Sequence, residues 1–173
     1  TNMAPHNLTE CCDAICAYID NPEITVEELM HYVKGPDFPT GGIIQGRQGI
    51  KDAFETGRGR IVIRSKTEIE VSDSGRETIV VTEIPYMVNK REMIEKIAEL
   101  VETKKVEGIA YINDETTMKG VRIVIRLKKD ANANVVLNML YKYSPLQSSF
   151  SVNNVALVNG RPRTLNLKQL IKY

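Results

Sequence analysis

The sequence is poor in several residue types, and each shortage narrows the possible functions. Its 173 residues include no Trp, two His and three Cys, and aromatic residues make up only 6%. Cys11, Cys12 and Cys16 are too few and too close together for a disulfide framework. No apolar run reaches the roughly 18 residues of a membrane-spanning helix, and no signal peptide opens the chain. We therefore expect a cytoplasmic protein with no membrane partner.

Recognisable catalytic motifs are also missing. Neither His6 nor His31 lies in the pattern of a catalytic triad, and no G-x-S-x-G motif occurs. Gly41 and Gly46 have the spacing of a phosphate loop, but Arg47-Gln48 follows them in place of the Lys-Ser/Thr that contacts phosphate and metal. No zinc-binding spacing or dinucleotide fingerprint is present. We expect the chain alone to be inactive as an enzyme and to bind neither a metal nor a cofactor.

Helix signals dominate the first third of the chain. Asn7 has the features of an N-cap and predicts a helix to about residue 20. Cys12 and Cys16 lie four residues apart on this helix, and we expect both to be small core side chains. Gly57 predicts the end of a further, brief helix. We interpret residues 1–55 as a helical and loop-like approach to the rest of the chain.

Apolar and polar residues alternate from residue 60 onward, which is typical of half-buried strands. One long strand is expected from Arg60 to Val71, with a hairpin turn after it. Asn89 and Asp130 are expected to cap two later helices. The order strand–strand–helix occurs twice, and it predicts an α+β two-layer sandwich: an antiparallel or mixed sheet with helices on one face. The expected divisions are 1–55, an α+β core at 56–164, and the start of a helix at 165–173.

Charge is strongly segregated, although the net charge is only +1. Residues 1–55 carry three Lys/Arg and nine Asp/Glu, and residues 67–118 carry six and twelve, so each segment has a net charge of −6. Residues 56–66 have a net charge of +4, and residues 119–173 carry ten bases and one acid. Such segregation can attract a polyanion to one surface. A dipolar surface without any partner is an equally good interpretation at this level.

The alternation also places basic side chains on one side of two expected strands. If these strands join one sheet, both basic rows lie on its open face, where they would attract the phosphates of DNA. The alternative is a solvated face balanced by nearby Glu68, Glu70 and Glu77. Further candidates lie beside glycines, which let a backbone approach a ligand closely. The two rows are Arg60, Arg64 and Lys66, and Arg122, Arg126 and Lys128; the further candidates are Arg58, Arg161 and Arg163.

Several strings in the sequence are highly specific. They include TNMAPHNL at 1–8, GPDFPTGGII at 35–44, GRQGIKDAFETGRGR at 46–60, EIPYMVNK at 83–90 and SFSVNNVALVNGRP at 149–162. Together they resemble the A subunits of bacterial DNA gyrase and of its paralogue topoisomerase IV, and the resemblance runs through the whole chain. Asn2 favours the gyrase paralogue.

This resemblance implies that the chain is the tower domain of a longer subunit, between a winged-helix domain and a coiled coil. It implies a role in an ATP-dependent type II DNA topoisomerase, whose catalytic tyrosine lies upstream of this fragment. Mg²⁺ and ATP are then used through the B subunit. The implied partners are double-stranded DNA, the gyrase B subunit and a second copy of the gyrase A subunit.

One functional position carries over from the family pattern. The usual opening T-N-I-P-P-H-N has an isoleucine that wedges between base pairs and bends the DNA; Met3 occupies this position, and Ala4 replaces a proline. The resemblance thus implies a DNA-supporting tower. The alternative is a purely structural spacer with little DNA contact. The candidate DNA-binding residues are Met3, Arg47, Arg58, Arg60, Arg64, Lys66, Arg122, Arg126 and Lys128.

Overall fold

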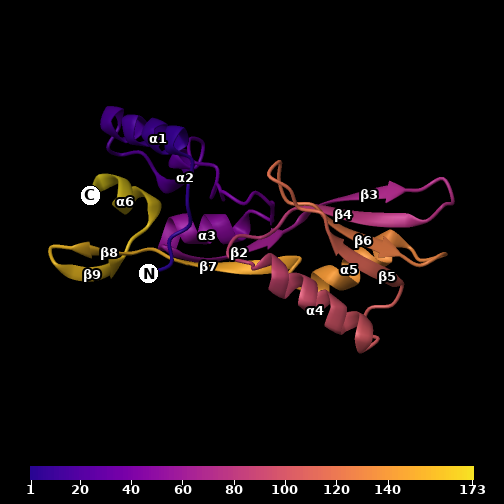
Figure 1. Ribbon diagram of the computed structural model, residues 1–173. Helices are drawn as coiled ribbons and strands as arrows, with labels where there is room; N and C mark the ends of the chain where they lie inside the picture. Colours follow the sequence, from indigo (N-terminus) through magenta and orange to yellow (C-terminus); the bar gives the residue numbers. More distant parts are fainter. The chain divides into compact units, whose positions relative to one another are not determined.

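The computed structural model describes all 173 residues, which form two compact units (Figure 1). Unit 1 comprises residues 1–39, 44–62 and 149–173, and unit 2 comprises residues 40–43 and 63–148. Both units are discontinuous in sequence. The fold class is α+β, as the sequence predicts, and no helix is long and apolar enough to cross a membrane.

Unit 1 contains four helices: α1 (Leu8–Asp20), α2 (Val26–Leu29), α3 (Gln48–Thr56) and α6 (Leu167–Lys172). Asn7 caps α1 as predicted, because its Oδ1 accepts the N–H of Glu10. Thr25 caps α2 in the same way, with its Oγ1 accepting the N–H of Glu28. Helix α6 packs against α1, α2 and α3. It begins with a reciprocal capping box between Asn166 and Gln169.

Two small sheets lie wholly or mainly in unit 1. The order β1 (Ile43–Gln45), β2 (Arg58–Arg64), β7 (Gln147–Asn153) forms one sheet, and β8 (Val155–Val158) pairs with β9 (Arg161–Thr164) in the other. Asn159 and Gly160 join β8 to β9 with positive φ at both residues, as a two-residue hairpin turn requires. Phe38 and Phe150 contact each other edge to face, with ring centroids 5.6 Å apart, in the core of unit 1.

The prediction that Cys12 and Cys16 are core side chains is wrong. Both are exposed thiols, and the neighbouring apolar residues on that side of α1, Leu8 and Ile19, are exposed as well. The side of α1 that packs is centred instead on Ala14, which is fully buried. Apolar residues surround most of this helix, so spacing alone does not identify the side that meets the core.

Unit 2 is a four-stranded antiparallel sheet with two helices on one face (Figure 1). The strand order is β3 (Lys66–Val71), β4 (Glu77–Glu83), β6 (Ile123–Leu127), β5 (Ile109–Asp114), and the helices are α4 (Lys90–Glu102) and α5 (Ala133–Tyr143). Alternate residues of β4 and β6 meet the buried side chains of the helices in one core. Its members include Ile79, Val81, Ile123, Ile125, Met93, Ile97 and Leu140.

The long strand expected from Arg60 to Val71 is two strands, β2 and β3, which belong to different sheets. The division falls at Ser65, a buried residue whose N–H donates to the carbonyl of Leu146 at 2.8 Å. The second half of the expected apolar side is also exposed, since Val71 retains 65% of its accessible surface. Strand β3 lies at the edge of its sheet, so fewer neighbours cover its side chains.

One of the two caps expected for the unit 2 helices is confirmed, and the other is wrong. Asn89 caps α4 as predicted, with its Oδ1 accepting the N–H groups of Arg91 and Glu92. Asp130 does not cap α5: it has a positive φ of 64°, and Asn132 is the N-cap. Glu77 adds a second acceptor at this helix end, because its Oε2 accepts the N–H of Ala133 at 2.5 Å.

Candidate nucleic-acid interface

The candidate DNA-binding residues divide between the two units. Met3, Arg47, Arg58 and Arg60 belong to unit 1, and the remaining five belong to unit 2. The expectation that two basic rows share the open face of a single sheet is therefore wrong: β2, which carries Arg60 and Arg64, is not in the sheet that contains β6. Alternation identified the sides of the strands, but it could not identify which strands are neighbours.

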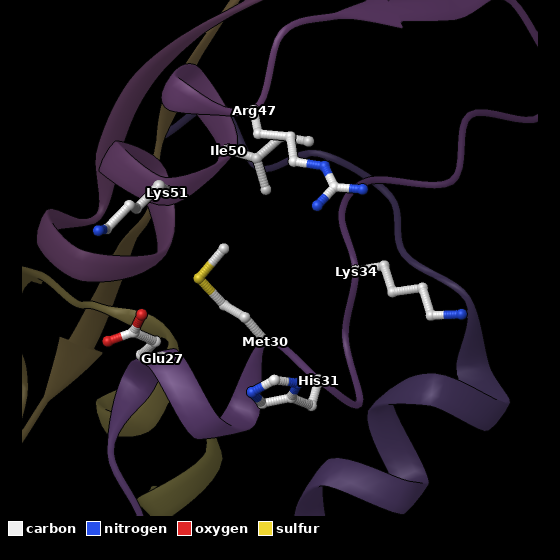
Figure 2. A pocket seen from close by; sticks show the side chains of 7 residues that line it. All are labelled: Glu27, Met30, His31, Lys34, Arg47, Ile50 and Lys51. Atoms are coloured by element: carbon white, nitrogen blue, oxygen red, sulfur yellow. The ribbon is translucent and has the colours of Figure 1, made fainter.

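Arg47 lies in a cationic hollow of unit 1 with a volume of about 390 Å³. Arg47 is the N-cap residue of α3 and Lys51 lies within this helix, while His31 and Lys34 follow α2. Figure 2 shows these side chains arranged around Met30. The remaining lining residues are Ile50 and one acid, Glu27. The hollow thus has an apolar floor and a rim that is mainly basic.

Few carboxylates compensate the cations of this hollow. Arg47 and Lys34 form no ion pair, and the only pair is between Lys51 and Glu55, with an Nζ–Oε1 distance of 3.8 Å. A pair of this kind between exposed side chains contributes at most about 1 kcal/mol. The positive potential of the rim is consequently available to an anion from outside the chain.

The position of α3 fixes Arg47 and Lys51 relative to β2. Gly49 of α3 faces the backbone of β2 so closely that a Cβ at this position would collide with the carbonyl group of Arg60. Gly59 approaches Gly49 in the same way from the strand side. Arg58 and Arg60, on either side of Gly59, are exposed and form no ion pair. Close backbone packing therefore places an arginine-rich strand beneath the helix that carries Arg47.

Met3 lies on a loop that is attached firmly to β7. The backbones of Asn2 and Asn153 exchange two hydrogen bonds of 2.9 Å, and Asn2 Nδ2 donates to the carbonyl of Ser151 at 2.6 Å. Ala4 is buried on the other side of Met3. The Met3 side chain is 48% exposed and lines an apolar hollow of about 410 Å³ in unit 1. This residue is therefore an apolar side chain on a fixed backbone.

His6 contributes to the rigidity of the same loop. Its Nδ1 lies 2.8 Å from the carbonyl oxygen of Ala4, and its ring centroid lies 5.6 Å from that of Phe54. Burial lowers the pKa of His6 below its ordinary value, against the smaller opposing effect of the Ala4 carbonyl. The ring is thus neutral at pH 7, and Nδ1 donates its hydrogen to that carbonyl.

Arg64 is bound within unit 2. Its Nε donates to Gln147 Oε1 at 2.7 Å, and its guanidinium carbon lies 4.6 Å from the centroid of the Tyr141 ring. A half-buried arginine with two such partners is held in one position. Lys66, at the start of β3, is exposed and forms no ion pair.

The second basic row, Arg122, Arg126 and Lys128, lies in unit 2, and its members differ in whether an acid compensates their charge. Arg122 Nε donates to Glu115 Oε2 at 3.2 Å, and Arg122 Nη2 lies 3.8 Å from Glu70 Oε1. The interpretation of a face balanced by acids therefore holds at Arg122. Arg126 and Lys128 are exposed without a carboxylate partner.

The structure adds cations that sequence reasoning missed. Lys51 follows Arg47 by four residues, so helical spacing could have placed the two on one side of α3. Lys34 lies in a different segment, and no periodicity connects it with Arg47. The proximity of Lys34 to Arg47 results from the fold of unit 1.

Comparison with known proteins gives a consistent result. The family model for the A subunit of DNA gyrase/topoisomerase IV matches residues 1–173. The chain is 55% identical over 173 residues to the DNA gyrase A subunit of Clostridium acetobutylicum, and 58% identical over 175 residues to that of Staphylococcus epidermidis. It is 58% identical over 173 residues to the DNA gyrase A subunit of Ureaplasma parvum.

These matches cover 100% of this chain, but only 20–21% of each relative. The chain therefore spans about one fifth of the length of the curated relatives that it matches. Since the family model and the identities both extend from the first residue to the last, the chain belongs to the family of DNA gyrase and topoisomerase IV A subunits.

Proposed function

We propose that this chain is the DNA-supporting tower of the A subunit of a bacterial type II topoisomerase, and that it holds and bends the duplex to be cleaved. The observation that carries the proposal is the cationic hollow of unit 1, in which the Arg47 guanidinium and the Lys34 ammonium form no ion pair. The backbone N–H of Lys34 donates to Glu10 Oε1 at 3.1 Å. Phosphate contacts of this kind position a duplex without reading its sequence. Membership of the family supports DNA as the polyanion.

The complete enzyme in this proposal is a cytoplasmic, ATP-dependent assembly of two A and two B subunits. The catalytic tyrosine belongs to the part of the A subunit upstream of this chain, so the chain alone has no cleavage activity. Mg²⁺ and ATP are bound by the B subunit. In this chain, no three His, Cys, Asp or Glu side chains lie together in a way that could hold a metal ion.

Removing the two unpaired cations of the hollow should weaken DNA binding and its dependence on salt. Each phosphate contact contributes about 0.9 to the slope of log K against log salt concentration. The double variant Lys34→Gln/Arg47→Gln, made in the complete A subunit, should therefore reduce the magnitude of that slope by about 2. Fluorescence anisotropy of a labelled duplex over a range of salt concentrations measures both quantities.

The double variant Lys168→Gln/Lys172→Gln is the matched control, since it removes two lysines of α6 that do not line the hollow. It should keep the slope of the unaltered protein. A Lys34/Arg47 variant with an unchanged slope would show that the hollow does not contact DNA. If no substitution of the basic residues proposed here changes DNA binding, the chain is a structural spacer instead.

Met3 is the proposed wedge of this tower. Met3→Ala in the complete enzyme should reduce DNA bending, measured by energy transfer between dyes at the duplex ends, because the shorter side chain no longer separates two base pairs. The stability of the chain should change by less than about 0.5 kcal/mol, since Met3 is half exposed. Met3→Ile, which restores the usual family residue, should keep the bend. Undiminished bending in Met3→Ala would refute the wedge.

A further inference from the structure

A second cationic hollow lies in unit 2, where sequence analysis singled out only one of its residues. It has a volume of about 520 Å³ and is built from three separate segments: the β3–β4 hairpin, the start of β5 and the end of β6. Its lining contains three bases, three hydroxyl side chains and Tyr111, but no Asp or Glu. The complete lining is Ser72, Ser74, Arg76, Thr78, Ala110, Tyr111, Arg126, Leu127 and Lys129.

The strand register places this hollow on the side of the sheet that carries no helix. Arg126 of β6 lies opposite Thr78 of β4 and Tyr111 of β5. The adjacent residue Ile125 is fully buried in the core beneath α4 and α5. Because successive side chains of a strand point to opposite faces, Arg126 and Thr78 face outward from the bare side of the sheet.

The cations of this hollow are held together without any compensating acid. Arg76, Arg126 and Lys129 form no ion pair, whereas the nearby Arg122 is paired with both Glu70 and Glu115. The guanidinium of Arg126 lies 5.5 Å from the centroid of the Tyr111 ring, an arrangement that limits its motion. Three like charges around one cavity repel one another, and an anion between them removes that repulsion.

The neutral groups of the hollow complete a set of donors. The hydroxyls of Ser72 and Ser74 lie 2.9 Å apart, and Thr78 adds a third. Guanidinium groups donate two parallel hydrogen bonds to the oxygens of a phosphate, and an ammonium group adds a point charge. The donor set thus matches a tetrahedral oxyanion with several exposed oxygens.

We propose that Arg76, Arg126 and Lys129 form a phosphate-binding site that holds a backbone phosphate of duplex DNA on the bare face of the unit 2 sheet. The identity of the ligand rests on the function proposed above, because the same donors also suit free inorganic phosphate. The site is separate from the hollow around Arg47, since the two lie in different units and share no residue.

Two measurements test separately whether the site binds phosphate and whether the phosphate that it binds belongs to DNA. The first is an NMR titration of the 173-residue chain with millimolar inorganic phosphate at constant ionic strength. We expect a saturable shift of the Arg126 side-chain signal that is lost in Arg76→Gln/Lys129→Gln. The second is the salt dependence of duplex binding by the complete A subunit, where the same variant should lower the magnitude of the slope by about 0.9 for the one phosphate contact that is lost.

The double variant Arg91→Gln/Lys96→Gln is the matched control, because both residues are on α4, which covers the opposite face of the sheet. It should leave both measurements unchanged. Absence of a saturable phosphate shift would overturn the site itself. A phosphate shift combined with an unaltered DNA slope in Arg76→Gln/Lys129→Gln would overturn DNA as the ligand. If the Lys34/Arg47 variant shows no slope effect while this one does, the function proposed for unit 1 fails and the unit 2 site stands.

Discussion

Gly49→Ala is expected to destabilise unit 1 by about 3 kcal/mol. A Cβ at this position would overlap the carbonyl group of Arg60, and backbone atoms cannot move aside as a flexible side chain can. Alanine favours a helix over glycine by about 1 kcal/mol, but overpacking against a fixed neighbour costs about 1–3 kcal/mol and more where backbone must shift. The free-energy cost of moving α3 away from β2 should therefore exceed the gain in helix propensity.

Chemical denaturation followed by circular dichroism measures this change. Gln48→Ala is the control, because it places the same side chain at the preceding, exposed position of the same helix. It should alter the free energy of unfolding by less than about 0.5 kcal/mol. Equal stability of the two variants would show that α3 can move away from β2 without cost. Since Arg47 precedes α3 directly and Lys51 lies in its first turn, Gly49→Ala should also weaken DNA binding in the complete protein.

Ile125→Ala should destabilise unit 2 by about 2–5 kcal/mol, the usual range for a fully buried aliphatic side chain that leaves a cavity. Ile125 lies in the middle of β6, with Ile79 of β4 and Ile112 of β5 as its partners in the register. Few neighbouring side chains can close the space, because β6 is flanked by strands on both sides and covered by helices.

Two control variants change positions of the same sheet that lie outside this core. Val71→Ala removes an aliphatic side chain that is 65% exposed, so its effect should remain below about 0.5 kcal/mol. Arg126→Gln changes the residue next to Ile125 but on the other face, and it should weaken phosphate binding without loss of stability. Thermal unfolding of the three variants checks this order. Comparable losses in Ile125→Ala and Val71→Ala would contradict the described core.

The helix ends were the most predictable part of the fold. Asn7, Thr25 and Asn89 cap helices through bonds to N–H groups two or three residues away, so the whole interaction is contained in a short stretch of sequence. Asp130 shows the limit of this reasoning. It is an equally good capping residue, but its backbone has a positive φ, and Asn132 two residues later takes the role.

The arrangement of strands was less predictable, because it depends on partners distant in the chain. The alternation of residues 60–71 reads as one strand, and nothing local reveals that Ser65 bonds to Leu146 and divides it into β2 and β3. The grouping of charges follows from that division. Arg122 was predicted as a DNA contact from its side of the strand, yet its ion pairs with Glu70 and Glu115 require the strand order of the folded sheet.

The cationic hollows were predictable only in part for the same reason. Arg47 and Arg126 were candidates from the sequence, while Lys34 and Arg76 beside them come from other segments. Lys129, three residues after Arg126, was not among the candidates. Family resemblance supplied a role for the chain as a whole. Which cations gather around each arginine is a property of the tertiary fold.

The discontinuous composition of unit 1 has a consequence for biosynthesis. A ribosome releases every residue of unit 2 before residue 149, so this unit can complete its core while the nascent chain is still growing. Unit 1 must wait, because most of β7, the β8–β9 hairpin and α6 follow unit 2 in the chain. Until then Phe38 lacks the Phe150 ring, and α1–α3 lack the helix that packs against them. Residues 1–39 are thus translated before unit 2 but reach their final structure after it.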